Sequence, residues 1–238
     1  MSSVEMWQQN LILETSPVEQ KITEKLLKWS DFSGTDLSGM DLRSLYLKGI
    51  NLIGTNLSNS NLSGLLLNES NFSGSNLVAA NLREADCREA NFFEANLVDA
   101  DLTKINLCGG FMWKVKLGRA NLFAASLCEA DLSEADLSQS NLAEASLIGA
   151  NLVRANLMRA NLGGARLVEA NLTQANLLGA DLRGASLCGA DLSEANLFGA
   201  NLWGANLTDV KLHNTIMPDG TVEQGEQILC PALINMSR

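Results

Sequence analysis

A strict five-residue period runs through most of this chain and limits what it can fold into. Starting at Phe32 and stepping by five, every position up to Leu212 is large and apolar, which makes 37 consecutive units. Thirty-two of these central residues are Leu. The exceptions are Phe32, Phe72, Cys87, Phe92 and Met112. Two residues before each centre lies a smaller residue, most often Ala, and Asn or Asp usually lies between the two.

A period of five fits neither of the regular secondary structures. Five residues advance an α-helix by about 140°, so the leucines would spiral around it instead of forming one face. In a straight strand an odd step sends alternate leucines to opposite faces of the sheet. The chain must therefore turn within every unit so that each Leu points at a common axis, which predicts a β-solenoid.

Departures from the consensus recur at twenty residues and indicate the length of one coil. The stretch "SLYLKG" at 44–49 is echoed by "GLLLNE" at 64–69, and Cys108, Cys128 and Cys188 are separated by multiples of twenty. Twenty residues are four units, so we expect a four-sided coil. The array then contains about nine coils, stacked at the spacing of neighbouring strands, about 4.8 Å.

The array A-(N/D)-L-x-x resembles the pentapeptide-repeat family, and the resemblance covers about residues 30–217. It implies an all-β fold, a right-handed quadrilateral β-helix, and so adds a handedness that the spacing does not give. The central residues are then expected to fill the interior as ladders. Between residues 35 and 65 the slot two before the centre holds larger residues than Ala, which predicts that the first two coils are wider or distorted.

Three regions are expected. Residues 1–29 form an N-terminal segment with a capping helix at about 16–29, because Ser16, Pro17 and Glu19 are typical of a helix start. Residues 30–217 form the β-helix. The stretch "IMPDG" at 216–220 is expected to end the array with a turn. Residues 218–238, which begin within it, are a C-terminal tail or cap; they either fold back, make a dimer contact as in the quinolone-resistance members of the family, or stay loose. The protein is thus expected to be a monomer, or a homodimer through its C-terminal end.

No pattern in the sequence indicates an enzyme. There is no Gly-rich phosphate loop, no nucleophile elbow and no metal-ligand spacing, so we expect no catalytic residues, no cofactor and no metal. The recurring Asn and Asp are expected to satisfy backbone groups. The net charge of −10 argues against direct nucleic-acid binding. No apolar run is long enough for a membrane span, and the scattered cysteines favour a reducing, cytoplasmic location. Stacked Cys108 and Cys128 are expected to be free thiols rather than a disulfide.

Function is therefore expected on the outer surface, where two features stand out. Tyr46 and Leu66 face outward on adjacent coils, and the apolar residues 11–13 are a candidate to cover them. The stretch "CGGFMWKVKLGR" at 108–119 keeps the five-residue spacing but changes the surface, because it brings aromatic and cationic residues into a region without acidic residues. The candidate partner-binding residues are Phe93, Phe111, Trp113, Lys114, Lys116 and Arg119.

The preferred hypothesis is a non-catalytic scaffold or regulator that binds a protein partner through the outer faces of the β-helix. A long array without protruding loops is similar to the arrays of cyanobacterial members of the family, which implies such a role. The alternative is an acidic rod that mimics DNA, binds DNA gyrase or topoisomerase and protects it from quinolones, as the quinolone-resistance members do. The sequence does not identify the partner.

Overall fold

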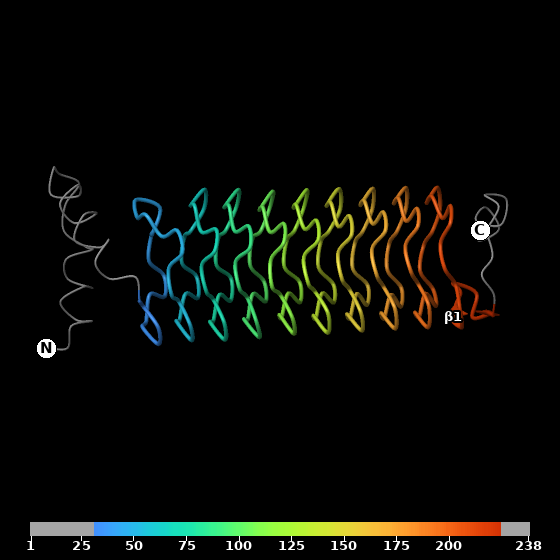
Figure 1. Cartoon of the computed structure of the whole chain (residues 1–238), viewed down its shortest axis with the longest axis horizontal. Coiled ribbons are helices and arrows are strands. Elements are labelled where there is room, and N and C mark those ends of the chain that lie inside the picture. The colour runs from blue at the N-terminus through green and yellow to red at the C-terminus, as the bar shows by residue number, and fades with distance from the viewer. Residues whose placement is uncertain (1–30, 225–238) are drawn as a thin grey trace, which may run out of the picture.

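The computed structural model describes residues 31–224, which form an elongated rod of stacked coils (Figure 1). Each coil is joined to the next by parallel β-bridges, and every bridge connects residues twenty apart, such as Asn156 and Asn176. From Asn51 onward four such bridges join each coil of twenty residues to the next, whereas the first coil, 31–50, has three. The expected coil length of twenty residues, with four short sides, is confirmed. The right-handedness, and the helix expected at 16–29, stay predictions; the helix lies outside the described residues.

We name the four sides after the centres of the first coil, which spans 31–50: the Phe32, Leu37, Leu42 and Leu47 sides. The N–H of a central residue typically bonds the carbonyl of the residue before the equivalent centre one coil later, as from Leu137 to Asn156 at 2.8 Å. The N–H of that Asn bonds back to Ala135 at 2.9 Å. Because each side is this short, almost all of the β-structure consists of isolated bridges.

A tight turn follows every centre and lets the chain change sides. The N–H three residues after the centre bonds back to the central carbonyl, for example from Ala80 to Leu77 at 3.0 Å. The third residue of the turn, two after the centre, has a positive φ at nearly every turn, and many of these residues are not Gly; Glu134, with a φ of 56°, is one. A positive φ at this position is that of a type II turn.

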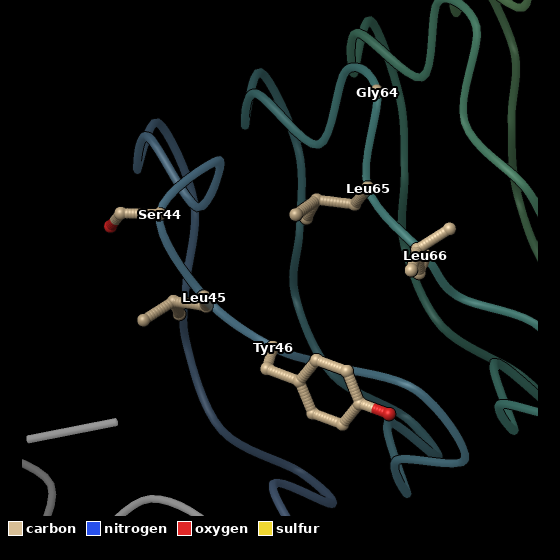
Figure 2. Close-up of a pocket in the computed structure, with 6 residues that line it drawn as sticks. All are labelled: Ser44, Leu45, Tyr46, Gly64, Leu65 and Leu66. Carbon is tan, nitrogen blue, oxygen red and sulfur yellow. The ribbon is translucent and has the colours of Figure 1, made fainter. Parts of the chain in front are cut away.

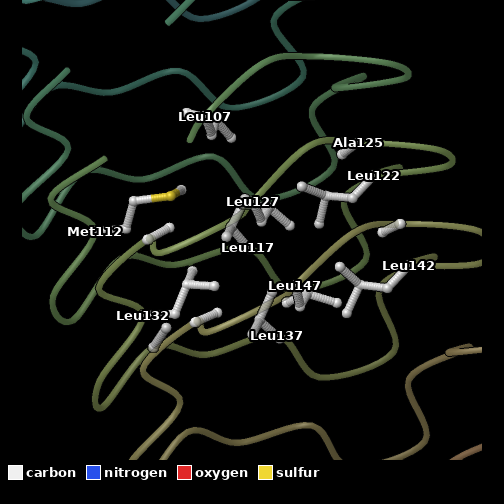
Figure 3. Close-up of a cluster of buried hydrophobic side chains, with 14 of the residues drawn as sticks. Leu107, Met112, Leu117, Leu122, Ala125, Leu127, Leu132, Leu137, Leu142 and Leu147 are labelled. Carbon is white, nitrogen blue, oxygen red and sulfur yellow. The ribbon is translucent and has the colours of Figure 1, made fainter. Parts of the chain in front are cut away.

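The interior is a continuous column of apolar side chains (Figure 3). The central leucines of the middle coils are completely buried, as are the alanines two residues before them. Phe72 and Phe92 stack on each other inside the column with ring centroids 4.6 Å apart. Each buried Leu contributes roughly 1.5–3 kcal/mol of hydrophobic stabilisation, so the repeated centres are the main source of stability.

The array ends in a small antiparallel hairpin. Strand β1 (Thr215–Ile216) pairs with β2 (Val222–Glu223), and a turn containing Asp219 and Gly220 connects them. This agrees with the turn expected at "IMPDG". The rest of the expected C-terminal tail, residues 225–238, lies outside the described residues.

Candidate interaction surface

The Asn and Asp before the centres have the structural role that the repeat predicts. From Asp31 to Asn206, each Asn or Asp at this position accepts a hydrogen bond through Oδ1 from the backbone N–H two residues later. Several Asn also donate through Nδ2 to the Asn or Asp one coil earlier, as from Asn156 to Asp136 at 3.0 Å. These residues fix the turns.

Two adjacent positions depart from this rule. On the Phe32, Leu37 and Leu42 sides, every position before a centre from Asp31 to Asn201 is Asn or Asp, apart from Phe111 and Lys116. The N–H groups of Trp113 and Gly118 consequently lack the side-chain acceptor that their equivalents on neighbouring coils have. A hydrogen bond of this kind contributes about 1 kcal/mol. The chain therefore gives up stability at these two positions.

The aromatic residues predicted for this surface come together on the Phe32 side. Phe93 and Trp113 stack across adjacent coils with ring centroids 5.2 Å apart and an interplanar angle of 24°. Lys114 Nζ lies 4.3 Å from the centroid of the Trp113 ring. Phe111 is 59% exposed and Trp113 38% exposed. The two rings therefore lie side by side on adjacent coils, and Phe111 is exposed on the same side of the rod.

Most of the cations of this region are paired with carboxylates of neighbouring coils. Arg119 makes a bidentate ion pair with Asp99, with N–O distances of 2.7 and 2.6 Å. The pair lowers the pKa of the Asp99 carboxyl, because Arg119 donates hydrogen bonds to it. Lys114 Nζ lies 3.8 Å from a Glu134 carboxylate oxygen. The carboxylate partners come from neighbouring coils and therefore lie outside the stretch 108–119 in the sequence.

Lys116 is the candidate cation that stays unpaired. Lys104, which adds to the positive charge of this stretch, lies 4.0 Å from a Glu84 carboxylate oxygen. By contrast, Lys116 is exposed and makes no ion pair within residues 31–224. The surface available to a partner thus consists of Phe93, Phe111 and Trp113 together with the unpaired ammonium group of Lys116. We call these four residues the aromatic patch.

Sequence reasoning missed the precise site of distortion near the start of the array. The first two coils are joined by bridges on three sides and not on the fourth, so of the two expected outcomes, wider or distorted, the structure shows a distortion. The distortion is local to the Leu47 side, where an opening lies between Tyr46 and Leu66 (Figure 2). The two large residues Leu45 and Leu65 in successive inward slots were the available signal. Exposed Phe198 and Trp203, at the other end of the rod, were also not singled out.

Residues 31–224 contain no group of three or more His, Cys, Asp and Glu side chains placed to hold a metal ion. Cys108 and Cys128 are free thiols, as expected. Burial raises the pKa of the Cys87 thiol, so this residue is a core group rather than a nucleophile. Among the same residues, no helix has the length and apolarity to cross a membrane.

Comparisons with known proteins agree with this geometry. The family model described as pentapeptide repeats, with 8 copies, matches residues 26–59, 70–109, 120–157, 155–193 and 175–214. HetL, a pentapeptide repeat protein involved in heterocyst differentiation regulation in the cyanobacterium Nostoc sp. strain PCC 7120, is 36% identical. That match covers 81% of this chain and 89% of HetL, with a TM-score of 0.43. No curated protein sequence gives a significant match.

Two further solved structures are similar. Rfr23, a pentapeptide repeat protein from the cyanobacterium Cyanothece 51142, is 42% identical over 39% of this chain and 63% of its own, with a TM-score of 0.38. QnrB1, a plasmid-mediated fluoroquinolone resistance protein, is 21% identical over 80% of this chain and 87% of its own; its TM-score of 0.53 shows a shared fold. Both the repeat geometry and the family model lead to one conclusion: the chain belongs to the pentapeptide-repeat family.

Proposed function

We propose that this protein is a non-catalytic scaffold or regulator that binds a protein partner through the aromatic patch. The observation that carries the proposal is the pair of departures at Phe111 and Lys116. Both residues replace a structural Asn or Asp, both are exposed, and both cost the fold a hydrogen bond. Residues that break a local rule without a gain in stability are expected at functional sites.

The composition of the patch indicates the chemistry of its partner. Aromatic side chains are enriched at the energetic centres of protein interfaces, and an exposed Phe next to a stacked aromatic pair supplies rigid apolar area. Because Lys116 has no carboxylate of its own, it is free to pair with one from outside. We therefore infer a partner surface with an apolar pocket and an acidic residue beside it.

The DNA-mimic alternative has less support from the outer surface. A mimic of the duplex needs carboxylates in regular rows, whereas many carboxylates here are already paired with cations. Arg88 pairs with Asp86 and Arg183 with Asp181, each with an N–O distance of 2.6 Å. The likeness to QnrB1 concerns the fold alone. A gyrase supercoiling assay with a fluoroquinolone decides this alternative, and we expect the protein to give no protection.

The aromatic patch can be tested by restoring the repeat. We expect Phe111→Asn with Lys116→Asn to keep or raise the melting temperature, because each Asn can accept the missing N–H bond. The same double variant should reduce partner capture from a lysate of the native host at least tenfold, measured by quantitative mass spectrometry. Trp203→Ala is the matched control, since it removes an exposed aromatic far from the patch.

Two results decide the test. Proteins captured by the native chain and by Trp203→Ala, but lost with the double variant, support the proposal. An identical set of captured proteins for all three chains would overturn it, because the patch would then be dispensable for binding.

A further inference from the structure

The ladder of bridges between coils has one gap. Bridges connect every side of successive coils from Asp31 to Ile216, except between Tyr46 and Leu66 on the Leu47 side. One coil later the same side is intact: Leu67 donates to Asp86 at 2.7 Å, and Asp86 donates to Leu65 at 2.9 Å. The equivalent bonds, Leu47 N–H to Leu66 and Leu66 N–H to Leu45, are missing within residues 31–224.

The local sequence explains the gap. From Gly34 to Asn214 the residue two after each centre has a positive φ, and Ser44 is the single exception in the described part of the chain. The turn before Tyr46 therefore sends the chain in a different direction. In addition, Leu45 lies one coil from Leu65, and no other pair of equivalent inward slots on successive coils within residues 31–224 holds two Leu. Ile105 has Ala on both neighbouring coils, and there the ladder is unbroken.

The gap forms an open, mainly apolar cavity of about 300 Å³ (Figure 2). Its lining residues are Ser44, Leu45, Tyr46, Gly64, Leu65 and Leu66. Tyr46 and Leu66 at the entrance are each 53% exposed. Backbone N–H and C=O groups that have no partner among residues 31–224 lie next to this apolar surface. Such groups are costly to leave unpaired when water is excluded.

We propose that residues Leu11–Leu13 of the same chain dock into this cavity as an extended segment. An extended segment offers what the gap lacks, because its backbone can pair with the free N–H and C=O groups while its side chains fill the apolar space. Leu-Ile-Leu is an uninterrupted apolar run among the thirty residues that precede Asp31. Asp31, to which the N-terminal residues are joined, belongs to the same coil as Tyr46 at the entrance of the cavity.

Chain length favours the N-terminal segment over the other terminus. Seventeen residues separate Leu13 from Asp31, and even fourteen of them in a helix span about 21 Å. The C-terminal residues 225–238 follow Gln224, which lies at the opposite end of the rod (Figure 1). A tethered segment near its site has a high effective concentration, which favours it over a separate molecule. This docking does not depend on the aromatic patch, which lies on a different side three coils further along.

Hydrogen exchange of the full-length chain tests the docking. We expect the amides of residues 44–47 to exchange at least tenfold faster after Leu11→Asp with Leu13→Asp, while exchange in 132–142 stays unchanged. A synthetic peptide of residues 7–16, added to this double variant, should restore the slow exchange. Leu66→Asn, which introduces the usual repeat residue at the entrance, should accelerate exchange in 44–47 in the same way.

The outcomes discriminate between occupants. Exchange in 44–47 that is equally fast, or equally slow, in the native chain and the Leu11→Asp/Leu13→Asp variant overturns the proposal. Protection that rises with protein concentration also overturns it, in favour of a second copy of the chain. Selective acceleration in both variants, with rescue by the peptide, supports docking of residues 11–13.

Discussion

Asn156 shows how one small side chain connects three coils. Its Oδ1 accepts the Met158 N–H at 3.3 Å and Asn176 Nδ2 at 3.2 Å, and its Nδ2 donates to Asp136 at 3.0 Å. We expect Asn156→Ala to reduce the free energy of unfolding by about 1–3 kcal/mol, since the three bonds are partly exposed and each is worth about 1 kcal/mol or less.

Arg166 provides the matched control for this prediction. It occupies the same position within its unit but lies on the Leu47 side, and its side chain makes no hydrogen bond or ion pair within residues 31–224. Arg166→Ala should therefore change stability by less than about 0.5 kcal/mol. Urea denaturation followed by circular dichroism measures both variants. Equal losses would contradict the role given to the Asn ladder.

From the sequence, a residue could be assigned to the interior or to the outer surface, but the partner of its side chain could not be predicted. The inward positions of Leu and Ala follow from the period alone, and so does the stacking of Phe93 on Trp113. The ion pair between Arg119 and Asp99 does not follow, because a long side chain can reach residues on the coil before it or after it. Ser44 was overlooked because a change of turn type depends on a dihedral angle that the repeat pattern does not report.

The β1–β2 hairpin ends the repeat array, and its turn depends on Gly220. This residue has a φ of +88°, and a Cβ added to it would lie 3.3 Å from the Phe198 ring. We expect Gly220→Ala to destabilise the hairpin by more than about 1 kcal/mol, through both backbone strain and this close contact. Hydrogen exchange in residues 215–223 should become faster.

Gly199→Ala separates the two causes. Gly199 also has a positive φ, of +68°, but a Cβ there meets nothing within 4 Å. Residues other than Gly take the same turn position on other coils, as Glu194 does with a φ of 60°. Gly199→Ala should accordingly have the smaller effect. If it accelerates exchange as much as Gly220→Ala, the contact with Phe198 is not important.

At the scale of the whole rod, the paired carboxylates predict how stability depends on pH. Arg88 donates hydrogen bonds to Asp86 and lowers the pKa of its carboxyl, and Arg183 does the same to Asp181. A carboxyl with a lowered pKa stabilises the fold above its unfolded-state pKa of about 3.9. This contribution is lost as the pH falls through the lower, folded-state pKa.

We therefore expect a melting temperature that varies little from pH 8 to about 5 and decreases below about 4. Asp86→Asn with Asp181→Asn should reduce this decrease, while the Asn residues keep the Oδ1 acceptor that each turn needs. The effect is modest, because largely exposed ion pairs contribute at most about 1 kcal/mol each. Melting curves measured across this pH range test it; an unaltered acid limb in the double variant would contradict it.

The spacing of twenty between bridged residues also restricts how such a rod can gain or lose length. Removing a single unit of five residues would preserve the sequence of buried leucines, yet it would rotate every later surface position by one side. Outer side chains beyond the deletion, such as those of the aromatic patch, would then face a quarter-turn away from their former neighbours. Only insertions or deletions of whole coils, four units at a time, lengthen or shorten the rod and leave each outer face continuous.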